Sequence, residues 1–381
     1  MVPWIESPTL DFDLDLPPAE RYLAIKGKPL ELGRELLSAV MAQVPPLMKP
    51  IADLARLRTA GRFTNEMKAI AARVETSWRD VMLGNLSYDL TLLSMACSTM
   101  ALATSEGPVL ARNMDFWPEG LLARASYLMR YRRGGKTEYI SAGWPGAVGI
   151  VTGYSARDTG RFAVALNAVM GPEKSSRTGY PVLLHIRRVV EDAKDFEDAV
   201  DMLSSQHIAL PTLFTVVGME NHQRVVIERS PKRYAIRKAE GDKPLMTTND
   251  YRLLYSAGTT GEHEMYGSTC MRYDSLCRFT AELSPDKPVA DEALLYMLTD
   301  PGVQQEITAQ HMIIRPGADS RGCGGQRGRA PGGGGPGPPA PAVYARSLDD
   351  EHLVDHAGHR ASTTGSVFLG LTMGCARCHE H

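Results

Sequence analysis

Apolar and polar residues alternate most clearly between residues 95 and 116, MACSTMALATSEGPVLARNMDF. Two apolar runs flank the turn Glu106-Gly107-Pro108, and period-two alternation on both sides of a Gly-Pro turn predicts a β-hairpin. The returning strand of that hairpin carries Arg112 and Asp115. We therefore expect the hairpin to bring these two side chains back beside Cys97.

The chain before the hairpin has mainly helical spacing. Between residues 30 and 80, apolar side chains recur every three or four positions, which is typical of amphipathic helices. Pro45-Pro46 divides this region, because proline interrupts helical hydrogen bonding. Alternation over residues 12–16 predicts one short strand near the start of the chain, ended by Pro17-Pro18.

After the hairpin, short β-type runs alternate with turns that contain glycine or proline. The predicted strands cover residues 126–132, 138–142, 147–152, 162–167, 212–218, 225–228 and 234–237. Helical spacing recurs at residues 181–193, 196–204, 270–283 and 291–298. Strands, two helices and further strands are compatible with two packed sheets covered by helices, but propensity alone leaves the order of the layers open.

The composition is that of an ordinary soluble chain. Its 381 residues can form one large domain or two smaller ones, with 43% hydrophobic and 23% charged residues. Lys and Arg number 42 against 44 Asp and Glu, so no basic surface points to nucleic acid. No apolar stretch approaches the length of a membrane span, and no secretory signal is visible, so we expect a cytoplasmic protein.

The six cysteines are too scattered to suggest a disulfide framework: Cys97, Cys270, Cys277, Cys323, Cys375 and Cys378. Cys97 differs from the others because the predicted hairpin folds an arginine and a carboxylate onto it. The cation would favour the thiolate, and the carboxylate would orient a proton carrier, as a nucleophile requires. The alternative is an inert cysteine buried in the core.

The hairpin also resembles a known family. A single cysteine, a turn and Arg-Asn-Met-Asp at residues 112–115 follow the order and spacing found in the cysteine branch of the N-terminal-nucleophile hydrolases, which includes acid ceramidase, N-acylethanolamine acid amidase and choloylglycine hydrolase. Two stretches before Cys97 are also similar, FDLDLPPAER at residues 12–21 and NLSYDL at residues 85–90. The resemblance implies an α+β fold, a four-layer αββα sandwich preceded by a mainly helical N-terminal segment.

The resemblance implies roles for three hairpin residues. The chain would cleave itself between Ala96 and Cys97, which makes Cys97 an N-terminal nucleophile. The new α-amine, with an ordinary pKa of roughly 7.7–8.0, would accept the thiol proton and later give it to the leaving amine. Asp115 would orient that amine, and Arg112 would stabilise the thiolate and contact the substrate carbonyl. The alternative without a catalytic role is an ordinary ion pair between Asp115 and Arg112.

Three later residues also match family positions. Asn167 and Asn249 match donors to the developing oxyanion, and Arg272 matches an arginine that braces the site. Each has a structural alternative, since asparagine often caps turns at strand ends and Arg272 falls on a predicted helix. Acid ceramidase has a glutamate just after the position of Asn167, whereas this chain has Ala168. At this point the asparagine arrangement is more similar to that of the bile-salt hydrolases.

The resemblance implies a hydrolase acting on linear amides. Its substrate would be a small N-acyl amide of the N-acylethanolamine, ceramide or bile-salt type, with no cofactor, metal or nucleic acid. We expect residues 1–96 to form a segment released or retained as a small subunit, and residues 97–320 to form the hydrolase domain. The two cleaved pieces could associate, or the chain could form a homo-oligomer. The alternative function is a catalytically inactive or chimeric relative that acts at most as a binding protein.

The composition changes abruptly at Arg321. Residues 321–345 are expected to form a Gly/Pro-rich linker, and residues 346–381 a disordered tail. Because the linker replaces the strand expected beside residues 308–314, we expect an unpaired sheet edge there. Deleting residues 321–381 should accordingly leave stability nearly unchanged.

A C-x-x-C-H pattern stands at the end of the chain, formed by Cys375, Cys378 and His379. It resembles the cytochrome-like segment of planctomycete-type multidomain proteins. A haem needs a surrounding fold and an axial partner, and neither is visible in the tail. We therefore expect a truncated fragment without haem, and zinc is the weaker alternative because a structural zinc site draws its ligands from an ordered fold.

Overall fold

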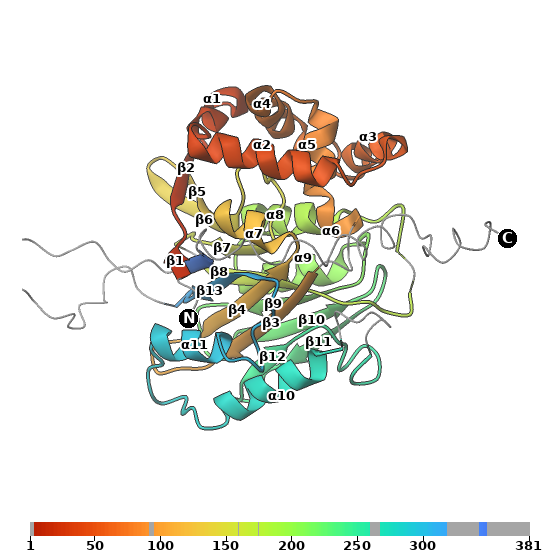
Figure 1. Cartoon of the computed structure of the whole chain (residues 1–381). Helices are drawn as coiled ribbons and strands as arrows, with labels where there is room; N and C mark the ends of the chain where they lie inside the picture. Colours follow the sequence, from red (N-terminus) through yellow and green to blue (C-terminus); the bar gives the residue numbers. More distant parts are fainter. Residues whose placement is uncertain are drawn as a thin grey trace, which may run out of the picture.

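Two β-sheets lie at the centre of the computed structural model, which describes residues 4–90, 95–158, 160–173, 175–259, 267–317 and 343–348 (Figure 1). In this described part of the chain the first sheet has the strand order β1-β14-β13-β4-β3-β12, and the second has the order β11-β10-β9-β8-β7-β6-β5-β2. The strands of the first sheet are β1 (Trp4–Glu6), β3 (Met95–Leu102), β4 (Val109–Phe116), β12 (Leu245–Thr247), β13 (Thr308–Ile314) and β14 (Val343–Leu348). Those of the second are β2 (Thr9–Asp13), β5 (Tyr127–Arg133), β6 (Lys136–Gly143), β7 (Thr152–Ser155), β8 (Phe162–Ala168), β9 (Thr212–Val217), β10 (Arg224–Arg229) and β11 (Tyr234–Lys238).

Helices cover the outer faces of both sheets. The described helices are α1 (Pro18–Arg21), α2 (Lys28–Met41), α3 (Lys49–Arg58), α4 (Thr64–Val74), α5 (Trp78–Asn85), α6 (Ser87–Leu90), α7 (Glu119–Arg124), α8 (Val182–Asp192), α9 (Phe196–Ser205), α10 (Thr269–Thr280) and α11 (Asp291–Leu298). Helices α10 and α11 pack on the first sheet, α8 and α9 pack on the second, and strand β3 packs against β8 and β9. The order of layers is therefore helix, sheet, sheet, helix, and the expected αββα sandwich is confirmed.

The predicted hairpin is the central pair of the first sheet. Strands β3 and β4 pair antiparallel, with Cys97 opposite Met114 and Thr99 opposite Arg112. Gly107 in the connecting turn has φ +93°, a left-handed conformation that favours glycine. Every residue of β4 is buried, because β3 and β13 flank it and the layers above and below cover both of its faces.

The segment before Cys97 contributes an edge strand to each sheet and a group of helices. Its helices α1 to α5 lie together at one end of the molecule, away from α10 and α11 (Figure 1). Strand β1 joins the first sheet through β14, and β2 joins the second sheet through a parallel pairing with β5. The strand predicted over residues 12–16 ends earlier, at Asp13, because the Asp13 carboxylate accepts the backbone N–H of Asp15 and turns the chain.

A buried charged cluster ties the same segment to the second sheet. The Arg187 guanidinium lies over the rings of Tyr131 and Tyr139, 4.7 and 4.9 Å from their centroids. Its Nη2 is 2.6 Å from Glu191 Oε1 and 3.3 Å from Glu66 Oε2. Glu66 belongs to α4, before Cys97, whereas the other residues follow Cys97. Buried charges paired in this way are costly to separate, so the cluster would oppose release of residues 1–96.

The expectation of an unpaired edge beside residues 308–314 is wrong. Strand β14 pairs antiparallel with β13, from Val343 opposite Ile314 to Ser347 opposite Gln310, and β1 covers the other side of β14. The closing strand lies beyond the Gly/Pro-rich stretch instead of directly after the turn at residues 316–317. It also crosses the boundary expected between residues 345 and 346.

The rest of the tail lies outside the described residues. The part that is not described includes most of the predicted linker and the motif of Cys375, Cys378 and His379. That motif stays a prediction from sequence. Among the helices that are described, none combines the length and the apolar character needed to cross a membrane.

Candidate active site

Cys97 lies on the inner face of the first sheet and its side chain is fully buried. Its Sγ accepts a hydrogen bond of 2.6 Å from Arg112 Nη2. Arg112 reaches the thiol from the neighbouring strand, because the residue directly opposite it on β3 is Thr99, two positions from Cys97 on the same face. The guanidinium is fixed from the second sheet, where Thr152 Oγ1 accepts a bond of 2.8 Å from Nη1.

The backbone of Cys97 is held by two other buried residues. Its N–H donates to Asn249 Oδ1 at 3.2 Å, and its carbonyl accepts Arg272 Nη1 at 2.7 Å. Arg272 Nη2 also donates to Asn249 Oδ1 at 2.7 Å, and Asn249 Nδ2 donates to the carbonyl of Ala168 at 2.8 Å. Asn249 follows β12 and Arg272 comes from α10, so the site joins elements far apart in the sequence.

Asn167 makes no described hydrogen bond to Cys97. Its Oδ1 accepts the Thr99 hydroxyl at 2.7 Å, and its Nδ2 donates to the carbonyls of Thr247 and Thr248 at 3.0 and 3.1 Å. Both hydrogens of this amide are therefore directed at backbone carbonyls. In this arrangement Asn167 holds β8 against the end of β12, and its role as an oxyanion donor stays a prediction.

Asp115 occupies the opposite face of β4 from Arg112 and pairs in register with Ala96. Its Oδ1 accepts the Thr308 hydroxyl at 2.6 Å, and its Oδ2 is buried with no hydrogen bond from any described residue. No described contact joins Asp115 and Arg112 as an ion pair. Asp115 is thus opposite Ala96 in the strand pair, and its Oδ2 accepts no hydrogen bond from a described residue.

Burial has the largest effect on the pKa of the Cys97 thiol and on that of the Asp115 carboxyl. It raises the pKa of the Cys97 thiol, although Arg112 acts in the opposite direction. Burial also raises the pKa of the Asp115 carboxyl, opposed by Arg272, by the Thr308 hydrogen bond and by Arg112. In the uncleaved chain the Arg112 guanidinium therefore reduces the cost of ionising the thiol without bringing its pKa below the ordinary value.

We expect Arg112→Ala to raise the pKa of the Cys97 thiol further, because the substitution removes a cation 2.6 Å from Sγ. The pH dependence of alkylation by iodoacetamide measures this, and the rise in rate should move to higher pH. Arg112→Lys is the control that keeps the charge, and its profile should lie between those of Arg112→Ala and the unaltered chain. Superimposable profiles for all three proteins would contradict a contact between guanidinium and thiol.

Three threonines of the site were not predicted. The Thr99 hydroxyl donates a hydrogen bond to Asn167, and the Thr152 hydroxyl accepts one from Arg112. The Thr308 hydroxyl donates one to Asp115. A lone threonine within a strand carries no sequence signal, because β-branched residues are common in strands for packing alone. Only Thr99 was within reach of prediction, since it lies two residues after Cys97 and opposite Arg112 in the expected hairpin.

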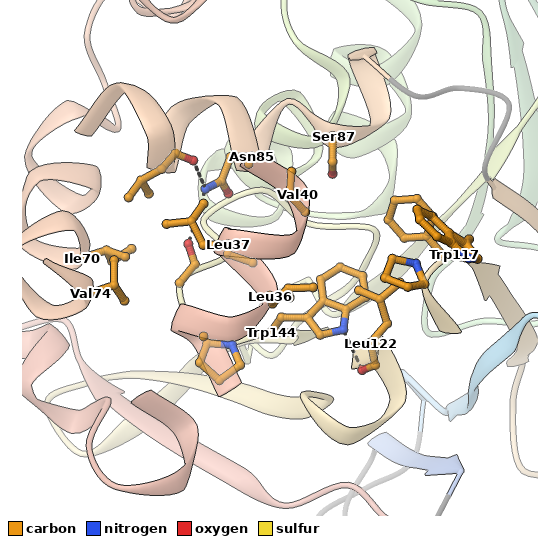
Figure 2. Close-up of a pocket in the computed structure, with 18 residues that line it drawn as sticks. Leu36, Leu37, Val40, Ile70, Val74, Asn85, Ser87, Trp117, Leu122 and Trp144 are labelled. Atoms are coloured by element: carbon orange, nitrogen blue, oxygen red, sulfur yellow. Dashed lines mark hydrogen bonds between the residues drawn. The ribbon is translucent and has the colours of Figure 1, made fainter. Parts of the chain in front are cut away.

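An apolar pocket of about 80 Å³ lies near the end of β4 (Figure 2). Its walls come from α2, α4, α5 and the chain around Trp117 and Trp144. The lining residues are Gly33, Leu36, Leu37, Val40, Ile70, Val74, Val81, Gly84, Asn85, Ser87, Phe116, Trp117, Pro118, Leu122, Trp144, Pro145, Gly146 and Ala147. Phe116, which lines the pocket, is two residues beyond Met114, the partner of Cys97, so the backbone of Phe116 lies about 7 Å further along the strand than that of Met114.

Comparison with known proteins finds a family, curated relatives and solved structures that are similar to this chain. The sequence model of the family described as acyl-coenzyme A:6-aminopenicillanic acid acyl-transferase matches residues 102–303. The N-acylethanolamine-hydrolyzing acid amidase of Caenorhabditis elegans is 24% identical over 239 residues, covering 58% of this chain and 66% of that protein. The acid ceramidase of Balaenoptera acutorostrata scammoni is 26% identical over 266 residues, covering 60% and 63%.

The chain therefore spans slightly less than two thirds of the length of these curated relatives. Among solved structures, the Caenorhabditis elegans N-acylethanolamine-hydrolyzing acid amidase ortholog has a TM-score of 0.47 and 20% identity, covering 58% of this chain and 93% of that chain. The matched range 102–303 contains the catalytic residues predicted from the sequence, Arg112, Asp115, Asn167, Asn249 and Arg272, but not Cys97, which lies five positions before it.

Proposed function

The chain belongs to the acyl-coenzyme A:6-aminopenicillanic acid acyl-transferase family, and from this premise we propose that it hydrolyses linear amide bonds of N-acyl substrates through a self-released Cys97. Similar proteins include an N-acylethanolamine-hydrolyzing acid amidase and acid ceramidases. The observation that carries the proposal is the hydrogen bond of 2.6 Å from Arg112 to the buried Cys97 thiol. A buried cysteine serving only to pack has no need of a buried cation at its sulfur.

The first step of the proposed reaction is self-cleavage of the Ala96–Cys97 bond. The Cys97 thiol adds to the carbonyl carbon of Ala96, the carbon–nitrogen bond breaks to leave a thioester and a free α-amine on Cys97, and water then hydrolyses the thioester, so that Ala96 ends in a carboxylate and the thiol is restored. That amine takes the thiol proton, and the thiolate attacks the carbonyl carbon of the substrate amide. The carbon–nitrogen bond of the substrate then breaks. The amine of the substrate leaves with the proton that the Cys97 α-amine had taken from the thiol, and a thioester between the acyl group and Cys97 remains. Water adds to the thioester, releases the acid and restores the thiol.

The surrounding residues suit these steps. The free Oδ2 of Asp115 is an acceptor beside the bond whose cleavage creates the amine. Arg272 and Asn249 hold the carbonyl and the N–H of Cys97, which keeps the nucleophile in place as its bond to Ala96 is lost. Asn249 is the stronger candidate for the oxyanion donor, because Asn167 has both amide hydrogens engaged.

The apolar pocket supports a substrate with an apolar acyl arm. Most of its lining side chains are apolar, with Asn85 and Ser87 as the polar exceptions. Trp144 donates its Nε1 hydrogen to the carbonyl of Leu122 (Figure 2). Its volume of about 80 Å³ is below the roughly 150 Å³ of a cavity that holds benzene. In the described arrangement, the pocket would take a short stretch of an acyl chain and would have to widen for a long one.

The experiment combines processing with turnover. Intact mass and N-terminal sequencing of the purified chain should show a fragment that begins at Cys97. A panel of N-acylethanolamines, ceramides, conjugated bile salts and penicillin V, with varied acyl length, should then identify the amide that is cleaved. An acyl-coenzyme A with an amine acceptor tests the transfer reaction in the family's description. A chain that stays whole and turns over none of these would support the inactive alternative.

A further inference from the structure

The carboxylate of Asp115 is buried, and its two oxygens differ in their surroundings. Oδ1 accepts a hydrogen bond of 2.6 Å from Thr308 Oγ1, whereas Oδ2 has no hydrogen-bond partner among the described residues. A buried acceptor without a partner is destabilising and calls for a reason. In register Asp115 is opposite Ala96, the residue whose carbonyl carbon is bonded to the nitrogen of Cys97.

The Thr308 hydroxyl has only one way to point its proton. Its oxygen accepts the backbone N–H of Gln305 at 3.0 Å, and its O–H therefore donates to Asp115. The register of β13 against β4 shifts between Thr308 and Gln310, which marks a β-bulge. Bulges often re-aim a side chain next to an active site, and this one leaves Thr308 opposite Asp115.

We propose that Thr308 is a positioning residue for self-cleavage and amide hydrolysis, holding Oδ1 of Asp115 so that Oδ2 faces the nitrogen of Cys97. The inference rests on the proposed function, in which that nitrogen becomes the α-amine. Thr308 does not touch the reacting atoms itself. Its hydroxyl fixes the carboxylate plane and stabilises the ionised form, which is the form that can bind a protonated amine.

Other charged groups also affect the pKa of the Asp115 carboxyl, and the contribution of Thr308 is the hydrogen bond that it donates. Arg272 from α10 and Arg112 from β4 lower the pKa of the Asp115 carboxyl, while burial raises it. Burial is the main cause of the raised pKa of the Cys97 thiol on β3, and the Asp115 carboxylate raises it further. Neither guanidinium donates a hydrogen bond to Asp115 in the described structure, so Thr308 supplies the contact that orients it.

The experiment compares Thr308→Val with Thr308→Ser. Valine keeps the shape and removes the hydroxyl, and serine keeps the hydroxyl. Thr59→Val is the matched control, because it removes a buried hydroxyl that donates to a backbone carbonyl in α3, away from the site. Melting curves verify that each variant folds. The readouts are the rate of self-cleavage against pH and the titration of the Asp115 carboxyl by carbon-13 NMR in a Cys97→Ala background.

Loss of the hydroxyl should raise the pKa of Asp115, and the acid limb of self-cleavage should move to higher pH by about 1 unit. At pH values on the acid side of that limb, self-cleavage of Thr308→Val should be slower than that of the unaltered chain by roughly tenfold. Thr308→Ser and Thr59→Val should keep the wild-type limb. A folded Thr308→Val with the wild-type limb and the wild-type carboxyl titration would overturn the inference.

Failure of the proposed function has a different signature. An unaltered chain that neither cleaves itself nor turns over any amide would defeat the proposed function and, with it, the role of Thr308 in catalysis. In that case a shifted carboxyl titration in Thr308→Val would still establish the contact that holds Asp115. An unshifted titration would overturn that contact too.

Discussion

Cys97→Ala is expected to abolish self-cleavage and amide hydrolysis together. In the proposed mechanism the same sulfur is the nucleophile in both reactions. Among the described cysteines no second thiol is placed to replace it, since Cys270 and Cys277 lie on α10. Removal of a nucleophile typically costs 10³-fold or more in rate. The fraction of cleaved chain on a denaturing gel and the release of free acid measure the two effects. The protein should stay folded, because alanine fits where cysteine did.

The matched controls are Cys270→Ala and Cys277→Ala. Cys270 is exposed and Cys277 is partly buried on the same helix, so these variants test thiol removal without loss of the proposed nucleophile. Both should process and turn over as the unaltered chain does. Near-normal turnover by Cys97→Ala would show that the chemistry belongs to another residue.

Truncation after Gly317 is expected to destabilise the protein by about 5 kcal/mol, because it removes β14. Val343 and Ala345 would leave the core, and Met312 and Ile314 on β13 would lose their cover, each apolar group being worth roughly 1.5–3 kcal/mol at most. Strand β1 would also lose its partner. Urea denaturation measures the change. This expectation replaces the earlier one, that residues 321–381 add no stability.

A truncation after Leu348 is the control for that experiment. It keeps every described contact of β14 and removes only the residues that follow, so its unfolding midpoint should match that of the full chain. If both truncated proteins unfolded at the same midpoint as the full chain, the pairing of β13 with β14 would be without energetic value. If both were equally destabilised, the stabilising contact would lie after Leu348.

The hairpin was predictable because its signals are local. Alternation, a Gly-Pro turn and the spacing from Cys97 to Arg112 lie within residues 95–116, and a hairpin needs no information from elsewhere in the chain. The helices before Cys97 were predictable for the same reason, since their apolar spacing repeats within each turn. The αββα order of layers came from the family resemblance, because propensity does not specify which sheet faces which.

Strand β14 was missed because its signal is weak and distant. VYARSL alternates, with Val343, Ala345 and Ser347 buried, but a six-residue alternation after a long Gly/Pro-rich stretch is poor evidence on its own. Its partner β13 ends 29 positions earlier. Pairing over such a distance is decided by the open edge of β13, which only the folded sheet presents.

The candidate site also contains some residues that could be predicted from the sequence and others that could not. Family positions identified Arg112, Asn249 and Arg272, and the structure places all three in hydrogen-bonding contact with Cys97. The threonines that orient Arg112 and Asp115 were missed, because hydroxyl contacts depend on rotamers and on the packing of one sheet against the other. The opposite faces of Arg112 and Asp115 follow from strand alternation and could have been derived from the sequence.

The most direct test of the account is the mass of the enzyme trapped with substrate. The processed protein is mixed with an N-acyl amide that it turns over, quenched in acid within the first turnover and digested for mass spectrometry. The account predicts a peptide whose first residue is Cys97 and whose mass is raised by the acyl group, absent after Arg112→Ala or without substrate. An acyl group on any other residue, or on Cys97 still joined to Ala96, would contradict it.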